Sequence, residues 1–402
     1  MSRKKYFRYT SFMKLAVNIV TMLLSIFAFM LIGEGILRLC PGQMLRENIP
    51  DFEQKNIYVN NPNTGYKMAP NLNTKFQGHI ITTDPFGFRK NVTSDDQLYN
   101  YTILAIGDSF TFGEGTEDKE NYVAELAEYF KNKDRNPKIN IINAGVPGFG
   151  TDQELEMLIE TKKLTHPNLV LLTFYTGNDL IDNMIGGIKR RRVESNGFLY
   201  DRYIENMACK ELKRNIFKLS LYKAGNFLEK RSLLFFLIKN RSELFLQKYF
   251  NWKVLDPYGY LDRGNFEFFR DPMPKKEEML FSKTIKLITD IKEESEKSGA
   301  KFAVVIIPAG FQVYEEIYKG LIYEYKLQEK DYNIEGLNSK LAKYIAKANI
   351  PVLDLLPAFK NRKDMHLYRW GHLSPDGNSV ATSEIISFLK QNNLIPSENI
   401  AN

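Results

Sequence analysis

The chain has 402 residues, of which 44% are hydrophobic and 26% charged, so it can bury the core of one large or two medium domains. Its two cysteines, Cys40 and Cys209, exclude a disulfide framework and a multi-cysteine metal site. The net charge of +7 comes mostly from five basic residues that precede the first acidic one: Arg3, Lys4, Lys5, Arg8 and Lys14. The rest of the chain is close to neutral, so the charge gives no reason to expect a nucleic-acid partner.

The N-terminal sequence predicts a membrane anchor. Residues 1–14 form a basic tail, and the 18 residues from Leu15 to Ile32 carry no charge. This run is long enough for a membrane-spanning helix, which we expect over 15–39. A cleaved signal peptide, cut near Gly33-Glu34-Gly35, is the alternative, but its apolar core is usually about 7–15 residues. The positive-inside rule then predicts a cytoplasmic tail and a main domain in the periplasm or outside the cell.

Residues 40–100 are expected to form a stem with short β elements. Turn signals at 60–65 and 70–73 are rich in asparagine, proline and glycine. Between and after them the sequence alternates polar and apolar residues, as in Lys75–Ile81, which predicts small paired strands.

From residue 101 the pattern alternates strands with helices. The predicted strands are Ile103–Ile106, Ile139–Asn143, Leu169–Phe174, Phe302–Ile307 and Ile350–Leu353. The predicted helices are Tyr122–Lys131, Asp152–Leu164, Phe281–Glu296, Ile334–Ala348 and Asp376–Lys390. This alternation predicts an α/β domain over 101–395, with a five-stranded parallel sheet between two helical layers. It fails between about 183 and 280, which we interpret as an insertion or cap.

Four sets of polar or glycine residues fall where the predicted strands end or the last helix starts. Ser109 follows the first strand, a turn containing Gly145 follows the second, Asn178 follows the third, and His372 precedes the last helix. Ligands of open α/β sheets bind beyond the carboxyl ends of the strands. A serine, a histidine and N–H donors there are the parts that acyl transfer requires. Taken singly, each has a structural alternative, such as a turn or helix cap.

As a set, these residues resemble the motifs of the SGNH/GDSL hydrolase family, over about 101–180 and 300–390. The matching residues are Gly107-Asp108-Ser109 with Gly113, then Gly145, then Gly177-Asn178-Asp179, and finally His372 with Gly377. The resemblance implies a flavodoxin-like fold, Ser109 as nucleophile and His372 as general base. It also implies an oxyanion hole made by the backbone N–H groups of Ser109 and Gly145 and the Asn178 amide. No cofactor and no metal is implied.

One position departs from the family pattern. The family usually has an aspartate three residues before the histidine, and this chain has Arg369 there. Asp364 is the candidate that can replace it, while Asp354 is expected to serve its own strand end. A backbone carbonyl is a further way to hold the imidazole tautomer.

The sequence therefore predicts a membrane-anchored serine ester hydrolase that acts on O-acyl esters outside the cytoplasm. Its substrate would be an acylated small molecule or an acylated envelope glycan. Two alternatives stay open: an O-acyltransferase of surface polysaccharide that uses the same residues, and a binding or scaffold protein that keeps the fold without the chemistry.

Overall fold

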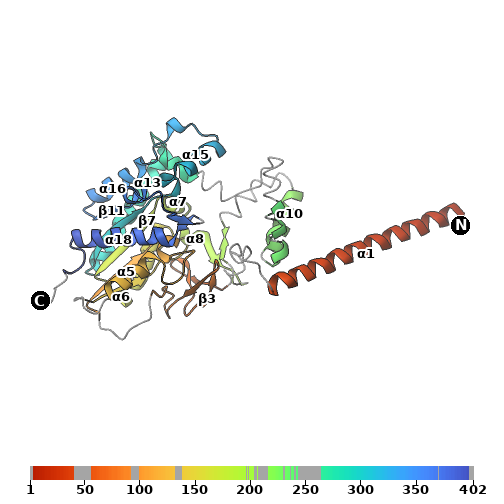
Figure 1. The fold of residues 1–402 in the computed structure, drawn as a ribbon, viewed down its shortest axis with the longest axis horizontal. Coiled ribbons are helices and arrows are strands. Elements are labelled where there is room, and N and C mark those ends of the chain that lie inside the picture. Colours follow the sequence, from red (N-terminus) through yellow and green to blue (C-terminus); the bar gives the residue numbers. More distant parts are fainter. Residues whose placement is uncertain are drawn as a thin grey trace. The chain divides into compact units, whose positions relative to one another are not determined.

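The computed structural model describes most of the chain, in these ranges: 3–39, 56–91, 99–131, 138–195, 197, 199–202, 206, 216–229, 231–235, 237–239, 241–242, 264–369 and 371–397. Both cysteines and much of the expected insertion lie outside the described residues. The chain divides into two compact units (Figure 1). One contains Met1–Phe52 and Cys209–Leu255, and the other contains Glu53–Ala208 and Asp256–Asn402.

The first unit contains the long N-terminal helix α1 (Arg3–Leu39) and helix α10 (Ile216–Glu229). The stretch Met13–Leu39 of α1 is long and apolar enough to cross a membrane, and none of its apolar window is buried. Near the end of α1, the Glu34 carboxylate accepts hydrogen bonds from the backbone N–H groups of Leu233 and Leu234, at 3.2 and 3.0 Å. Glu34 thereby caps the start of a helical segment that is distant in sequence.

The second unit is built on a parallel sheet in the order β11-β10-β7-β5-β6. Its strands are β5 (Tyr101–Ile106), β6 (Ile139–Asn143), β7 (Leu169–Tyr175), β10 (Lys301–Ile307) and β11 (Val352–Asp354). The predicted fold class, a five-stranded parallel sheet with helices on both faces, is confirmed. Strand boundaries differ from the predicted ones by up to two residues, because the apolar pattern marks the buried centre of a strand better than its ends.

Helices cover both faces of the sheet (Figure 1). One face packs against α5 (Tyr122–Lys131), α17 (Leu356–Lys360) and α18 (Pro375–Gln391), and the other against α6 (Thr151–Thr165), α13 (Lys275–Lys297) and α16 (Gly336–Lys347). Within β5, Ile103 and Ala105 pack on the face covered by α5, α17 and α18. Leu104 and Ile106 pack on the face covered by α6, α13 and α16. A strand buried on both sides has no polar face, which explains its uninterrupted apolar sequence.

Helix α6 begins at Thr151, but its N-cap is Gly150 rather than Thr151. The Gln153 side chain accepts a hydrogen bond from the Gly150 N–H at 3.2 Å. The pair Gly150 and Gln153 therefore defines the start of this helix.

Residues 56–91 form two hairpins, β1 (Tyr58–Asn61) with β2 (Gly65–Met68) and β3 (Asn73–Phe76) with β4 (His79–Thr82). The expected pairing within 75–81 is thus present. Tyr66 and Phe76 from these hairpins are fully buried and belong to the same core as α6 and α13. This part of the expected stem is an integral layer of the second unit.

The remaining elements are short. They are α4 (Ser109–Phe112), α7 (Asp179–Ile185), α8 (Gly187–Arg190), β8 (Arg191–Val193), β9 (Leu199–Asp201), α14 (Gly310–Val313), α15 (Glu315–Glu324), β12 (Tyr368–Arg369), β13 (His372–Leu373), and the 3-10 helices η1 (Glu267–Phe269) and η2 (Glu329–Asp331).

Candidate active site

Ser109 opens the one-turn helix α4 directly beyond the carboxyl end of β5. The Asp108 carboxylate caps this helix by accepting the Phe110 N–H at 2.8 Å. Gly113 ends α4 in the left-handed region, with φ of 82°. The backbone N–H of Ser109 has no partner inside α4, because the first N–H groups of a helix lack one.

His372 begins β13, in the short hairpin that precedes α18. Its Nε2 lies 2.9 Å from Ser109 Oγ, although the two residues are 263 positions apart. The approach of α18 depends on Gly377, where a Cβ would lie 2.1 Å from the Leu367 carbonyl oxygen. Ser374 caps the helix and accepts the Gly377 N–H at 3.1 Å. A tight helix start therefore fixes the strand that carries His372.

Two other side chains lie near the His372 ring. The Phe110 ring is tilted against it with centroids 5.3 Å apart, and Phe110 itself stacks on Tyr175 at 3.9 Å. Glu114 Oε2 lies 3.8 Å from His372 Nε2. This is the same ring nitrogen that faces Ser109.

The structure does not bring Asp364 to His372. Asp364 is exposed in the turn after α17, and among the described residues no carboxylate contacts the Nδ1 of His372. Asp354 accepts hydrogen bonds from Asn338 at 2.8 Å and from the Leu356 N–H at 3.0 Å, the strand-end role expected for it. Arg369 pairs with His372 across the hairpin.

Gly145 lies where α4 passes closest to the turn after β6. A Cβ on Gly145 would lie 2.3 Å from the Phe112 backbone nitrogen, so only glycine fits. Its N–H donates to Asn143 Oδ1 at 3.1 Å. The Asn143 amide in turn donates to the Thr111 carbonyl at 2.9 Å. Gly145 is therefore packed beside the helix of Ser109, with its N–H engaged locally.

Asn178 is the N-cap residue of α7 at the carboxyl end of β7. Its Nδ2 donates to the Asp182 carboxylate at 2.8 Å, and its Oδ1 is buried without a partner among the described residues. A side-chain hydrogen bond from Asn178 also acts to lower the pKa of Asp108, so the amide faces two carboxylates.

Buried carboxyl groups lie around these strand ends. Burial raises the pKa of Asp108 to about 7, and the nearby Asp182 and Glu114 charges act in the same direction. Burial also raises the pKa of Glu154 and that of Asp179 well above the usual range, reinforced by their proximity to Asp108. The common cause is burial, because a carboxylate removed from water without a cation is costly.

The loop that follows Ser109 is held by residues 56–91. The fully buried Arg89 side chain donates to the Asp118 carboxylate at 3.0 Å and to the carbonyls of Phe112, Gly113 and Thr116. Gln77 donates from its amide to Glu114 Oε1. The hairpin region therefore fixes the loop that carries Glu114.

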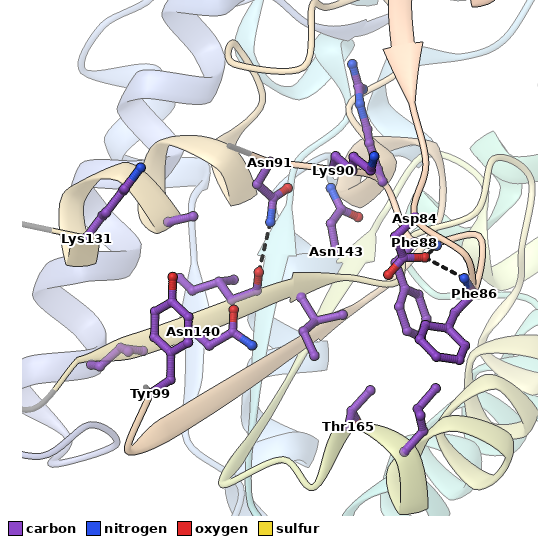
Figure 2. A pocket seen from close by; sticks show the side chains of 16 residues that line it. Asp84, Phe86, Phe88, Lys90, Asn91, Tyr99, Lys131, Asn140, Asn143 and Thr165 are labelled. Carbon is purple, nitrogen blue, oxygen red and sulfur yellow. Dashed lines mark hydrogen bonds between the residues drawn. The ribbon is translucent and has the colours of Figure 1, made fainter. Parts of the chain in front are cut away.

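A cavity of about 420 Å³ lies beside the edge strand β6, away from Ser109 and His372. Figure 2 shows Phe86 and Phe88 side by side at one end and Tyr99 at the other. The Asn91 amide donates to the Ile141 carbonyl at 2.9 Å across its upper side (Figure 2). This cavity contains none of the residues expected to carry the chemistry.

Comparison with solved structures finds esterases among the similar chains. TesA has a TM-score of 0.37 and 12% identity, over 72% of this chain and 98% of its own. The psychrotrophic esterase EstA from Pseudoalteromonas sp. has a TM-score of 0.36 and 13% identity, over 73% and 99%. Axe2, an acetylxylan esterase from Geobacillus stearothermophilus, has a TM-score of 0.37 and 11% identity, over 73% and 96%. No family model and no curated protein matches the chain.

Sequence reasoning missed Glu114, Gln77 and Arg89. Glu114 directly follows the Gly113 of the serine motif, but an acidic residue after a glycine is ordinary loop composition. Gln77 and Arg89 lie in a segment interpreted as a stem, and only the folded chain brings them to the serine loop.

Proposed function

We propose that this protein is a serine ester hydrolase, with Ser109 as nucleophile and His372 as general base. One observation carries the proposal: the 2.9 Å contact between Ser109 Oγ and His372 Nε2 at the carboxyl edge of the sheet. Hydroxyl and imidazole within hydrogen-bond reach are the signature of an activated nucleophile. With the imidazole proton on Nδ1, Nε2 accepts the serine proton during attack on an ester carbonyl.

The oxyanion of the tetrahedral intermediate needs donors in place. The Ser109 N–H at the start of α4 is the first candidate, because it has no helical acceptor. The Asn178 amide is the next, and it serves if it turns away from Asp108 and Asp182. Gly145 supplies the close packing beside α4, and its own N–H serves only if it leaves Asn143. Each donor of such a site is worth about 2.7–4 kcal/mol to the transition state.

We further propose that α1 anchors the enzyme in a membrane, with residues 1–14 cytoplasmic and the second unit outside. The apolar stretch Met13–Leu39 and the basic residues before it support this orientation. An outward-facing hydrolase of this kind fits acylated envelope glycans or small acyl esters as substrates. A C-terminal alkaline phosphatase fusion, active only outside the cytoplasm, tests the orientation, and an inactive, stably expressed fusion contradicts it.

A serine-directed fluorophosphonate tests the chemistry. The full chain in detergent should be labelled, and Ser109→Ala should not, while Ser387→Ala, which removes an exposed hydroxyl on α18, should keep labelling. The wild type and the control variant should also hydrolyse p-nitrophenyl acetate, and Ser109→Ala should not. Failure of the wild type to label or to hydrolyse would instead favour a non-catalytic scaffold, a role consistent with Arg369 in the aspartate position. A rate that rises with added sugar acceptor, with the acyl group recovered on the sugar, would favour the transferase.

A further inference from the structure

The site lacks a carboxylate where the family pattern has one. When His372 takes the proton of Ser109, its ring becomes a cation that an adjacent anion stabilises. The aspartate position is Arg369, and Asp364 is exposed in another turn. Of the ion pairs among the described residues, the one that includes His372 joins it to Glu114, at 3.8 Å.

Glu114 is held for this contact from two sides. Its backbone N–H donates to the Ser109 carbonyl oxygen at 2.9 Å, which ties it to the nucleophile's own helix. The Gln77 amide engages Oε1, so Oε2 is the oxygen turned toward His372. The Glu114 side chain is only 11% exposed, and a charge interaction at a partly buried site is far less screened than one in water.

We propose that Glu114 is the anion that compensates the charge of His372 during the reaction, an inference that rests on the function proposed above. As Ser109 Oγ bonds to the ester carbonyl carbon, its proton passes to His372 Nε2 and the carbonyl electron pair moves to the oxygen. The imidazolium then gives this proton to the leaving alcohol oxygen as the ester C–O bond breaks. Glu114 gains and loses no proton; it attracts the ring only while the ring is charged.

The position of Glu114 differs from that of an aspartate behind Nδ1. Because Glu114 approaches Nε2, it stabilises the imidazolium without holding the proton of the neutral ring on Nδ1. The hairpin of β12 and β13 and the contact with Phe110 orient the neutral ring. Glu114 is thus a charge-compensating residue that acts through His372, and its loss should act on the transition state rather than on substrate binding.

Steady-state hydrolysis of p-nitrophenyl acetate by the full chain in detergent tests this role. Glu114→Gln keeps the shape and a partner for Gln77 but removes the charge. We expect kcat to fall about 10- to 100-fold with KM within about twofold, and Glu114→Asp to recover part of the loss. Glu117→Gln is the matched control, because Glu117 lies in the same loop and accepts the Ile80 N–H from the same hairpin, yet has no contact with His372. It should keep the wild-type kcat.

The outcomes separate the inference from the function beneath it. If Ser109→Ala abolishes hydrolysis but Glu114→Gln keeps kcat within about twofold, the role of Glu114 is wrong and the hydrolase stands. Equal losses in Glu114→Gln and Glu117→Gln, with matching falls in thermal stability, make Glu114 only a structural contact and overturn the inference. If Ser109→Ala hydrolyses the ester at the wild-type rate, the proposed function is wrong, and the role of Glu114 is wrong with it.

Discussion

Ser109 and His372 meet at 2.9 Å, but the two sides of the site are held by different means. Ser109 is buried, directly follows the interior strand β5, and has Gly145 packed against its helix. His372 sits in a hairpin of two-residue strands, partly exposed, with no carboxylate at Nδ1 among the described residues. The serine side is fixed by the sheet and by close backbone packing, whereas the histidine side depends on a helix start and on one aromatic neighbour.

This difference suggests where the site is vulnerable. On the serine side, position and chemistry are coded by adjacent residues of one motif. On the histidine side, the charge comes from Glu114, which belongs to the serine loop and is supported by the N-terminal hairpins. The four predictions that follow test this division, in order of expected effect.

The largest effect is expected when either half of the pair is removed. Ser109→Ala, His372→Ala and the double variant should each lose about 10⁴-fold or more in kcat/KM and reach a common floor, because the two groups act as one unit. Hydrolysis of p-nitrophenyl acetate measures this, with unchanged thermal unfolding as the control. Losses that multiply in the double variant would mean that the two residues act separately.

Arg89→Met should produce the largest loss of stability. It leaves Asp118 and three backbone carbonyls without their buried cation, which costs about 3–5 kcal/mol in the free energy of unfolding. Denaturant unfolding of the detergent-solubilised chain measures it. Lys90→Met, which changes the adjacent exposed cation, should differ by less than about 0.5 kcal/mol. A similar small change in both variants would show that the hairpins do not brace the serine loop.

Arg369→Asp should strengthen the histidine side. Residues paired across an antiparallel hairpin share a face, so a carboxylate at position 369 can reach the ring of His372. We expect kcat to rise about 10-fold, a fraction of what an orienting acid contributes in serine hydrolases. Arg369→Asn is the control, because it removes the cation without adding an anion. An equal gain in both variants would assign the effect to loss of the cation.

The smallest effect concerns pH. The pKa of Asp108 is raised to about 7, so between its ordinary value of 3.8 and 7 the folded state binds more protons than the unfolded state. Stability should therefore fall as pH rises through this window, with the full penalty present above pH 7. Asp108→Asn keeps an oxygen for the Phe110 N–H and should flatten the fall in melting temperature between pH 5 and pH 8. The same slope in the variant would exclude Asp108 as its source.

Much of the fold could be predicted because its signals are local. The uninterrupted apolar run of β5 and the helical period of α5 each lie within a few residues, and both elements form where expected. Ser109 and its strand-end position follow from the same local pattern. The expectation that Ser109 lies at the carboxyl edge of a parallel sheet rests on the same pattern, because parallel strands bring their carboxyl ends to one edge.

Three features could not be read from the chain. No sequence motif marks Glu114, and its proposed role depends on the 3.8 Å distance between its Oε2 and His372 Nε2, which lies far along the sequence. Residues 56–91 look like a connector, since short alternating segments do not reveal whether they pack on a core. Asp364 is exposed, and the described ion pair of His372 is with Glu114, because sequence proximity to His372 does not set the direction of a side chain in a turn.

The sequence by itself determined the membrane-length apolar helix, the α/β sheet and the serine that follows its first strand, because each is specified by neighbouring residues along the chain. Only the tertiary structure decided which carboxylate faces the histidine and which segment braces the serine loop. Those contacts join residues tens to hundreds of positions apart, and they exist only once packing has closed the distance between them.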